Sequence, residues 1–166
     1  KILDLGYGDG RHLIFFKKLN LNVHGVEISD EINLLTKKNF NKIKISNITL
    51  KKGDNEKIPF KNSYFHHLVS WNSCYYMKNN RSKFEDHINE MARVLRKSGF
   101  LILSIPKSNC FIFKNSKIYK KKYRIIKSDY FKKRNGQVMR YFENVKEIKS
   151  DFSKLFKNIF ISEIDM

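Results

Sequence analysis

The chain has 166 residues, of which 41% are hydrophobic and 14% aromatic, so it can bury a core and does not have the composition of a disordered protein. No apolar run approaches the roughly 20 residues that span a membrane, and no signal peptide is visible, so no membrane partner is expected. Cys74 and Cys110 are too few for a disulfide framework, which indicates reduced thiols and a cytoplasmic location.

The net charge of +18 is unevenly distributed. Between Lys107 and Phe142, twelve Lys or Arg residues and one acid, Asp129, leave a charge of +11. An even distribution would give this stretch about +4, so the clustering is real. The overall bias toward Lys, Asn, Ile, Phe and Tyr is typical of AT-rich genomes, so the basic charge alone is weak evidence for a nucleic-acid partner.

The first part of the chain predicts strands that alternate with helices. Ile2–Leu5 is short, apolar and followed by glycine, as expected of a buried parallel strand. In the helix predicted after the second strand, Ile32, Leu35 and Phe40 are expected to face inward. The predicted elements are Ile2–Leu5 (strand), Arg11–Leu19 (helix), Asn22–Ile28 (strand), Glu31–Phe40 (helix), Ile43–Gly53 (strand) and His67–Trp71 (strand).

The best-defined helix begins at a capping-box pattern, Ser82 followed by Glu85, and Gly99 is expected to form its C-terminal cap. Its apolar stripe consists of Phe84, Ile88, Met91, Ala92 and Leu95. Phe100–Ile105 predicts a fifth strand. Asn144 and Glu147 open a last helix with Ile148, Phe152, Leu155 and Phe156 inward, and Asn158–Ile164 predicts a last strand.

This alternation predicts an α/β fold, a Rossmann-like doubly wound and mostly parallel sheet with helices on both faces. We expect one domain over residues 1–166. Residues 1–106 form its ligand-binding core, residues 107–142 a basic and aromatic insertion for substrate recognition, and residues 143–166 a C-terminal helix and strand. Ligands of such sheets bind at the carboxyl ends of the strands.

The most informative motif follows the first strand, as Asp4-Leu5-Gly6-Tyr7-Gly8-Asp9-Gly10. Glycines permit a sharp turn and close approach of a ligand, and a loop that ends at a helix N-terminus presents free N–H groups. The spacing differs from the dinucleotide fingerprint G-x-G-x-x-G, because the third glycine comes one residue early. Glu27 ends the second strand, where a carboxylate can accept two hydrogen bonds from a ribose diol.

Together, these residues resemble motif I and the following acidic position of the class I S-adenosylmethionine-dependent methyltransferases. The segment from Gly53 to Phe60, and Glu90–Gly99, also resemble the small-molecule, type 11-like members of that family. The resemblance covers roughly residues 1–106, with weaker likeness from Arg140 to Ile164. It leads us to expect that an N-terminal segment and a seventh strand lie outside this sequence.

The resemblance implies S-adenosyl-L-methionine as the cofactor. Gly6, Gly8 and Gly10 would pass close to its methionine portion, and Asp4 would help to hold the amino group. The side chain of Tyr7 could stack on the ligand or pack away from it. The remaining implied contacts are Glu27 at the ribose hydroxyls, Asp54 and Asn55 at the adenine, and Ser70 along the cofactor. Ile28 is a further implied cofactor-binding residue.

One departure concerns the start of the fourth strand, where the family commonly has Asp and this chain has His66 and His67. Both histidines are expected to be structural. Asn72, Tyr75 and Tyr76 are candidates to face the pocket, but the sequence assigns no catalytic base and predicts no metal site. Methyl transfer from a sulfonium needs such a base only where the acceptor must lose a proton.

We therefore expect S-adenosylmethionine-dependent methyl transfer to a small, anionic metabolite. Methylation of RNA through the basic 107–142 stretch is the alternative with the same chemistry, and RNA is the less favoured partner. A non-catalytic cofactor-binding scaffold protein is a further alternative. A nicotinamide dehydrogenase is the least favoured, because of Asp4 and the glycine spacing.

Overall fold

The computed structural model describes residues 1–130, 132 and 134–164. The chain divides into two compact units. The first unit comprises Lys1–Cys74 and Asn89–Ile105, and the second comprises Tyr75–Ile88 and the chain from Pro106 onward. The organisation as one domain stays a prediction. None of the described helices has the length and apolarity needed to cross a membrane.

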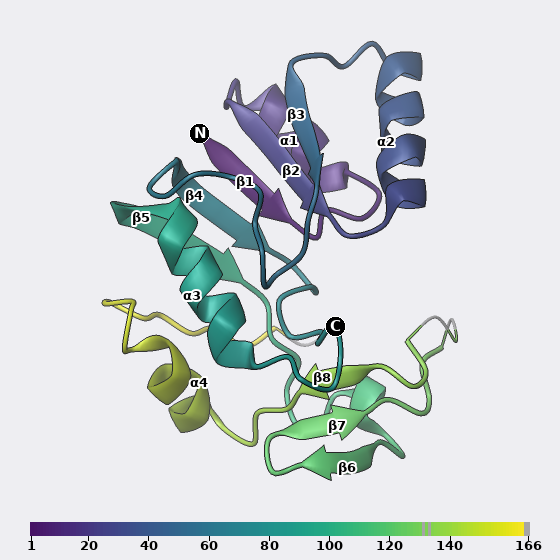
Figure 1. Ribbon diagram of the computed structural model, residues 1–166, viewed down its shortest axis with the longest axis vertical. Coiled ribbons are helices and arrows are strands. Elements are labelled where there is room, and N and C mark those ends of the chain that lie inside the picture. Colours follow the sequence, from purple (N-terminus) through teal and green to yellow (C-terminus); the bar gives the residue numbers. More distant parts are fainter. Residues whose placement is uncertain (131, 133, 165–166) are drawn as a thin grey trace. The chain divides into compact units, whose positions relative to one another are not determined.

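The first unit is built on a five-stranded parallel sheet with the order β3-β2-β1-β4-β5, which confirms the Rossmann-like prediction (Figure 1). Helices α1 and α2 pack against strands β1 to β3. The elements are β1 (Ile2–Leu5), α1 (Arg11–Lys18), β2 (Val23–Glu27), α2 (Asp30–Lys42), β3 (Ile48–Lys52), β4 (Phe65–Ser70), the second half of α3 (Phe84–Val94) and β5 (Leu95–Leu103). The first half of α3, up to Ile88, belongs to the second unit.

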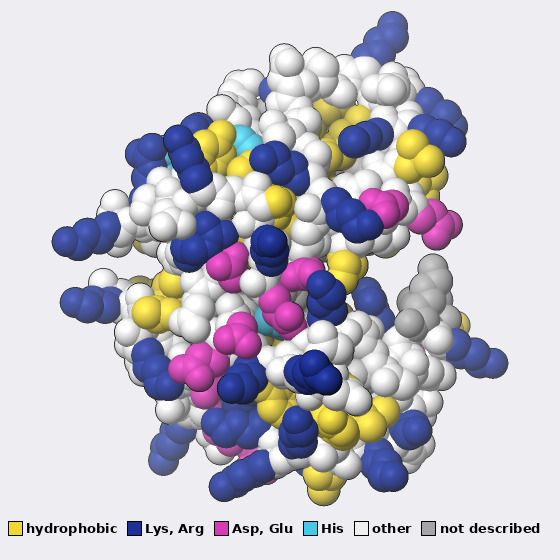
Figure 2. Space-filling view, viewed as in Figure 1, with side chains coloured by type: hydrophobic (Ala, Val, Ile, Leu, Met, Phe, Trp, Pro, Cys, Tyr) yellow, Lys and Arg dark blue, Asp and Glu magenta, His cyan; other side chains and the backbone are white. Residues whose placement is uncertain are grey.

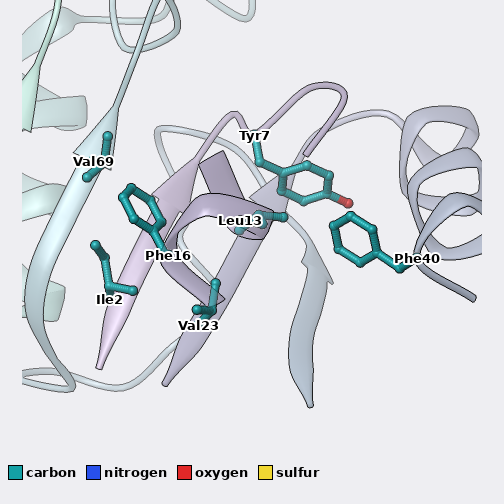
Figure 3. Packing of buried hydrophobic residues seen from close by; sticks show 7 residues of the cluster. All are labelled: Ile2, Tyr7, Leu13, Phe16, Val23, Phe40 and Val69. Atoms are coloured by element: carbon teal, nitrogen blue, oxygen red, sulfur yellow. The ribbon is translucent and has the colours of Figure 1, made fainter. Parts of the chain in front are cut away.

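Burial along the strands follows their places in the sheet. Every residue of β1 and β2 is buried, because these interior strands are covered on both faces, whereas the edge strand β3 is mostly exposed. A cluster of apolar side chains from the sheet, α1 and α2 forms the core under the glycine loop (Figure 3). Its buried members are Ile2, Tyr7, Leu13, Phe16, Val23, Phe40 and Val69.

Helix α2 has a serine as its N-cap, but the residues on its buried face differ from the predicted ones. Ser29 accepts a hydrogen bond from the Ile32 N–H at 3.2 Å as the N-cap. The buried residues are Asn33, Thr36 and Phe40, and Leu35 is 57% exposed. The prediction for Leu35 was wrong, because two polar side chains occupy the buried face and bond to loop backbone.

The start of β3 was also predicted wrongly. Lys44 and Asn47 have φ angles of +56° and +60°, which no strand residue adopts, so the chain turns between α2 and Ile48. The predicted strand from Ile43 is therefore shortened at its beginning.

In the α3 region, the predicted helix and most of its predicted apolar stripe are confirmed. Both predicted caps of this helix are wrong. The helix begins at Phe84, and Ser82 Oγ instead accepts a hydrogen bond from the Asn79 N–H at 3.1 Å. It ends at Val94, directly before β5, so Gly99 lies within the strand. A Cβ at Gly99 would approach the carbonyl oxygens of Arg96 and His66 to 3.0 Å, which explains a glycine there by packing rather than capping.

The second unit contains a three-stranded antiparallel sheet, which the sequence analysis did not predict. The strands of this sheet are rich in basic residues and lack the clear alternation of apolar and polar residues by which a strand is predicted from sequence. The Asn144 cap of the last helix is confirmed, since Asn144 Oδ1 accepts from the Glu147 N–H at 3.1 Å. The elements are η1 (Phe111–Phe113), β6 (Lys117–Lys120), β7 (Tyr123–Ile125), β8 (Val138–Arg140) and α4 (Val145–Phe152).

The predicted last strand, Asn158–Ile164, is wrong, because these residues form no regular structure and Phe160 is 93% exposed. Leu155 is 50% exposed, so it does not face inward as expected. Phe131, one of the aromatic residues that the sequence places in the basic stretch, lies outside the described residues.

Candidate active site

The carboxyl ends of β1 to β4 lie at one edge of the first unit's sheet, and the predicted acids Asp4, Glu27 and Asp54 occupy the ends of three of these strands. This is the edge at which doubly wound sheets bind ligands. These strand ends all belong to the first unit.

Asp4 is 1% exposed, and its Oδ2 atom has no hydrogen-bond partner among the described residues. The Nδ1 atom of the His12 imidazole lies 3.8 Å from Oδ2, beyond hydrogen-bond distance. Burial, followed by the charges of Glu27 and Asp9, raises the pKa of Asp4 to about 7. A buried carboxylate oxygen without a donor is costly, so this atom is suited to accept a hydrogen bond from a ligand.

The three glycines of the loop all have left-handed backbone angles, with φ of +75° at Gly6, +55° at Gly8 and +81° at Gly10. Gly6 also needs to lack a side chain, because a Cβ there would lie 1.9 Å from Ser73 Oγ. Gly10 is the N-cap of α1 and packs closely against Phe40 and Thr36 of α2.

Gly8 is different, since a Cβ there would meet no atom of the described part of the chain within 4 Å. Its N–H donates to Glu27 Oε2 at 3.1 Å, and its carbonyl accepts from Thr36 Oγ1 at 3.3 Å. The loop is thus held at Gly8 by both of its backbone polar groups, while the space above Gly8 stays open.

Glu27 is 8% exposed and already bound to backbone donors. Besides Gly8, the Ile28 N–H donates to Oε1 at 2.8 Å, and the Ser29 N–H lies at 3.5 Å from the same oxygen. A carboxylate has about four acceptor positions, so Glu27 can orient the loop and still accept from a ligand hydroxyl. The side chain of Ile28 is 50% exposed beside it.

Tyr7 packs away from the loop's open side, as a member of the core cluster beside Phe40 (Figure 3). Its hydroxyl donates to Asn33 Oδ1, and Asn33 Nδ2 in turn donates to the Glu27 carbonyl at 3.2 Å. Burial, with smaller effects from Glu27 and Asp4, raises the pKa of Tyr7. Of the two orientations left open by the sequence, the structure has the packed one. The Tyr7 carbonyl accepts a hydrogen bond from the Gly10 N–H at 3.0 Å within the loop.

Asp54 closes a tight turn after β3, where its Oδ1 accepts from the N–H groups of Glu56 and Lys57, both at 2.9 Å. Asn55 Nδ2 donates to the Ser73 carbonyl at 3.3 Å. Ser73 therefore touches both the loop after β1, through Gly6, and the loop after β3.

Ser70 is fully buried, and its hydroxyl donates to the Leu5 carbonyl at 3.3 Å. Asn72 lies just beyond it with a φ of +54°, and its N–H donates to Ser104 Oγ at 2.8 Å. The other candidates for the pocket, Tyr75 and Tyr76, belong to the second unit. His66 is exposed, and His67 stacks on Phe100 with ring centroids 5.8 Å apart.

A shallow cavity of about 330 Å³ lies elsewhere, with His24, Thr49 and Lys51 among its lining residues. His24 is the second residue of β2, three positions before Glu27, so this cavity is not at the strand-end site. Burial lowers the pKa of His24, whose ring lies edge-on to Phe60, Tyr64 and Phe65.

The sequence analysis missed Ser73, His12 and the α2 residues Asn33 and Thr36, all of which contact the strand-end residues. The signal for the α2 pair was present. Asn33, Thr36 and Phe40 follow helical spacing on one face, and polar residues on a buried face need partners. No comparable signal marked Ser73, because only the fold brings it to Gly6.

The residues fit S-adenosyl-L-methionine as a ligand. Asp4 supplies an unpartnered carboxylate oxygen for an ammonium group, Gly8 supplies open space beside the backbone, and Glu27 retains acceptor capacity for a ribose hydroxyl.

The parallel sheet and these strand-end residues define a Rossmann-like domain of the class I methyltransferase type. Residues 2–99 match the family described as "Methyltransferase domain", and the chain belongs to this family. The cofactor of this class is S-adenosyl-L-methionine.

Among curated proteins, the chain is 31% identical over 119 residues to a tRNA (guanine-N(7)-)-methyltransferase of Helicobacter pylori. The alignment covers 66% of this chain and 29% of that protein, so the chain matches less than a third of the relative's length.

Two solved structures share the fold over most of the chain. The PH0226 protein of Pyrococcus horikoshii has a TM-score of 0.70 and 17% identity, covering 92% of this chain and 71% of that one. A SAM-dependent methyltransferase of Thermotoga maritima has a TM-score of 0.62 and 23% identity, covering 93% and 62%.

Proposed function

We propose that the protein containing this chain is an enzyme that transfers a methyl group from S-adenosyl-L-methionine to an anionic acceptor. The observation that carries the proposal is the unpartnered, buried Oδ2 of Asp4 beside the Gly6–Gly10 loop. A merely structural buried acid would be paired with a hydrogen-bond donor or a cation, and the His12 Nδ1 atom is too distant to serve as a hydrogen-bond donor.

In this proposal, Asp4 accepts a hydrogen bond from the amino group of the methionine portion, which passes over the backbone of Gly6, Tyr7, Gly8 and Gly10. Glu27 accepts from the ribose hydroxyls and Ile28 borders them. Asp54 and Asn55 frame the adenine, and Ser70 supports the pocket from within the sheet by fixing Leu5.

The cofactor supplies an activated methyl group on a sulfonium, so the protein's main task is to position the acceptor in line and to exclude water. Carboxyl groups on three strand ends, of which Asp4 and Glu27 are buried, also favour binding of a cationic sulfonium over its neutral product. No residue of the described chain is assigned as a base.

For the methyl acceptor we propose only its charge, which is negative. A small anionic metabolite was the first expectation from the sequence, because cations and aromatic residues cluster between Lys107 and Phe142. The Helicobacter relative, whose printed name gives tRNA as its substrate, supports RNA as a second candidate. The cytoplasmic location likewise stays a prediction.

A methyl-transfer assay tests the proposal. The full-length protein is incubated with methyl-labelled cofactor and separate pools of phosphorylated metabolites, carboxylated metabolites and total RNA. The proposal expects label in at least one pool and its loss in the Asp4→Asn variant. Absence of transfer to every pool, by a protein that binds the cofactor, would favour the scaffold alternative.

A further inference from the structure

On and beside the hairpin of β6 and β7 in the second unit, four lysines have neither an acidic nor a carbonyl partner among the described residues, and they are here called the hairpin lysines. They are Lys114, Lys117, Lys121 and Lys127. All four are exposed, and within residues 1–130, 132 and 134–164 no carboxylate lies at ion-pair distance from any of them. Their charges are therefore available to a partner. Lys120 of β6 differs from them, because its Nζ donates to the Asn80 carbonyl at 3.2 Å.

Several acids of the second unit pair with other cations. Asp151 binds the buried Arg140 at 2.8 Å and Lys122 at 3.5 Å, and Arg140 also lies over the Phe142 ring at 3.9 Å. Glu85 pairs with Lys154 at 3.2 Å. The unit thus separates its structural ion pairs from the hairpin lysines.

The strand register places the hairpin lysines at both ends of the hairpin. Lys117 pairs with Ile125 at the open end of the hairpin, while Lys121 lies in the turn to β7. Lys114 precedes Lys117 by three residues and Lys127 follows Ile125 by two, so both lie in the chain next to the open end. At about 3.3 Å per strand residue, the two ends are roughly 10 Å apart. A spread of this kind suits a polyanion that extends along the hairpin better than one compact anion.

Exposed aromatic and apolar side chains accompany this charge. Phe111 is 55% exposed, whereas its neighbour Phe113 is buried edge-on to Tyr141, which anchors η1 and leaves Phe111 outward. Ile118 of β6 is 66% exposed. Figure 2 shows Lys and Arg side chains beside hydrophobic ones in the region that holds β6 to β8 in Figure 1.

We infer that the hairpin lysines and Phe111 form a docking surface for single-stranded RNA, with phosphates on the lysines and a base stacked on Phe111. This combination of dispersed cations and exposed aromatic rings is the one by which proteins hold single strands. The inference rests on the proposed function, because it makes RNA the carrier of the methyl acceptor.

Fluorescence anisotropy with a fluorescein-labelled single-stranded oligoribonucleotide tests the surface in the full-length protein. The variant is Lys114→Gln, Lys117→Gln and Lys121→Gln together. The matched control is Lys37→Gln, Lys38→Gln and Lys42→Gln, three exposed lysines of α2 in the first unit that make the same change in net charge. A Phe111→Ala variant tests stacking.

The wild type should bind RNA with affinity that falls steeply between about 50 and 200 mM salt. Loss of three phosphate contacts should lower the slope of log affinity against log salt by roughly 2 and weaken binding at least tenfold, and the α2 control should change neither. Phe111→Ala should weaken binding at every salt concentration by a similar factor.

Equal weakening by both triple variants, or absence of RNA binding by the wild type, would overturn the surface. So would binding only to phosphatidylcholine vesicles that contain phosphatidylserine, or only to phosphorylated metabolites. Calorimetry with S-adenosylhomocysteine on the same samples separates the two claims, since failure of RNA binding leaves cofactor binding intact, whereas failure of the proposed function abolishes it.

Discussion

Gly6 and Ser73 approach so closely that a Cβ on Gly6 would lie 1.9 Å from the Ser73 hydroxyl oxygen. This contact joins the loop after β1 to the loop after β4, and Asn55 extends it to the loop after β3 through the Ser73 carbonyl. Three strand ends of the site are therefore held together at one serine.

Gly6→Ala should consequently disrupt the site more than a simple backbone substitution. Alanine at a left-handed φ costs about 1 kcal/mol, and the clash with Ser73 adds to it, so unfolding free energy should fall by about 2–4 kcal/mol. Gly136→Ala is the control, because Gly136 has a φ of +82° but no atom of the described residues within 4 Å of its Cβ position. Urea denaturation measures both. Equal losses of unfolding free energy in the two variants would show that the clash with Ser73 adds nothing to the cost of Gly6→Ala.

Asp4 should make stability depend on pH in an unusual direction. Its pKa is raised from 3.8 to about 7, so the folded chain holds a proton that the unfolded chain has released. Stability should therefore fall as pH rises from about 4 to 7, by at most about 4 kcal/mol from this group, and level off above 7. Melting temperatures of the cofactor-free protein measure this trend, and Asp4→Asn should remove it. A slope unchanged in Asp4→Asn would contradict the assignment.

Arg93 should stabilise the segment between β3 and β4. Its guanidinium donates to the Ile58 and Phe60 carbonyls, both at 2.8 Å, and binds Glu90 at 2.7 Å. Arg93→Met should lower unfolding free energy by about 1–3 kcal/mol, because two carbonyls and a carboxylate lose their donor. Arg11→Met, at the exposed Arg11–Asp9 pair, should leave stability unchanged in the same denaturation experiment. A neutral Arg93→Met would show that the segment is held by other contacts.

In the second unit, Asp151→Asn should be severely destabilising. It leaves the guanidinium of Arg140, which is 1% exposed, without its closest carboxylate. Removing one partner of a buried pair costs about 3–5 kcal/mol, whereas Glu85→Gln at the exposed Lys154 pair should cost less than about 1 kcal/mol. Protection of the β8 amides from hydrogen exchange should fall only in Asp151→Asn. Similar exchange in the two variants would contradict this reading.

The sequence predicted the first unit well, since its strands are short apolar runs that end in glycine or acid, and parallel strands need helical crossovers. It predicted the second unit poorly. Lys117–Lys120 and Tyr123–Ile125 pair as strands through backbone hydrogen bonds, and their basic side chains do not form the alternating apolar pattern from which a strand is predicted. The residues Asn158–Ile164 form no strand.

In the site, the strand-end acids and the glycine loop could be predicted from local motifs. The glycines that permit the positive φ angles, and the carboxylates, each lie within or shortly after a short strand. Contacts between distant residues could not be read in this way. Ser73, His12 and Thr36 reach the loop only through the sheet order and the α2 packing. The orientation of Tyr7 was undecided for the same reason, since its partner Asn33 is 26 residues away in sequence.

The central claim is that the unpartnered Asp4 carboxylate belongs to a site for S-adenosyl-L-methionine. Calorimetric titration of the full-length protein with S-adenosylhomocysteine, for the wild type and Asp4→Asn at pH 8, tests it most directly. We predict saturable one-to-one binding by the wild type. For Asp4→Asn we predict a dissociation constant that is roughly 10- to 100-fold larger, because the variant loses one charge-assisted hydrogen bond. Absence of binding by a folded wild type, or equal affinity in the variant, would contradict the account.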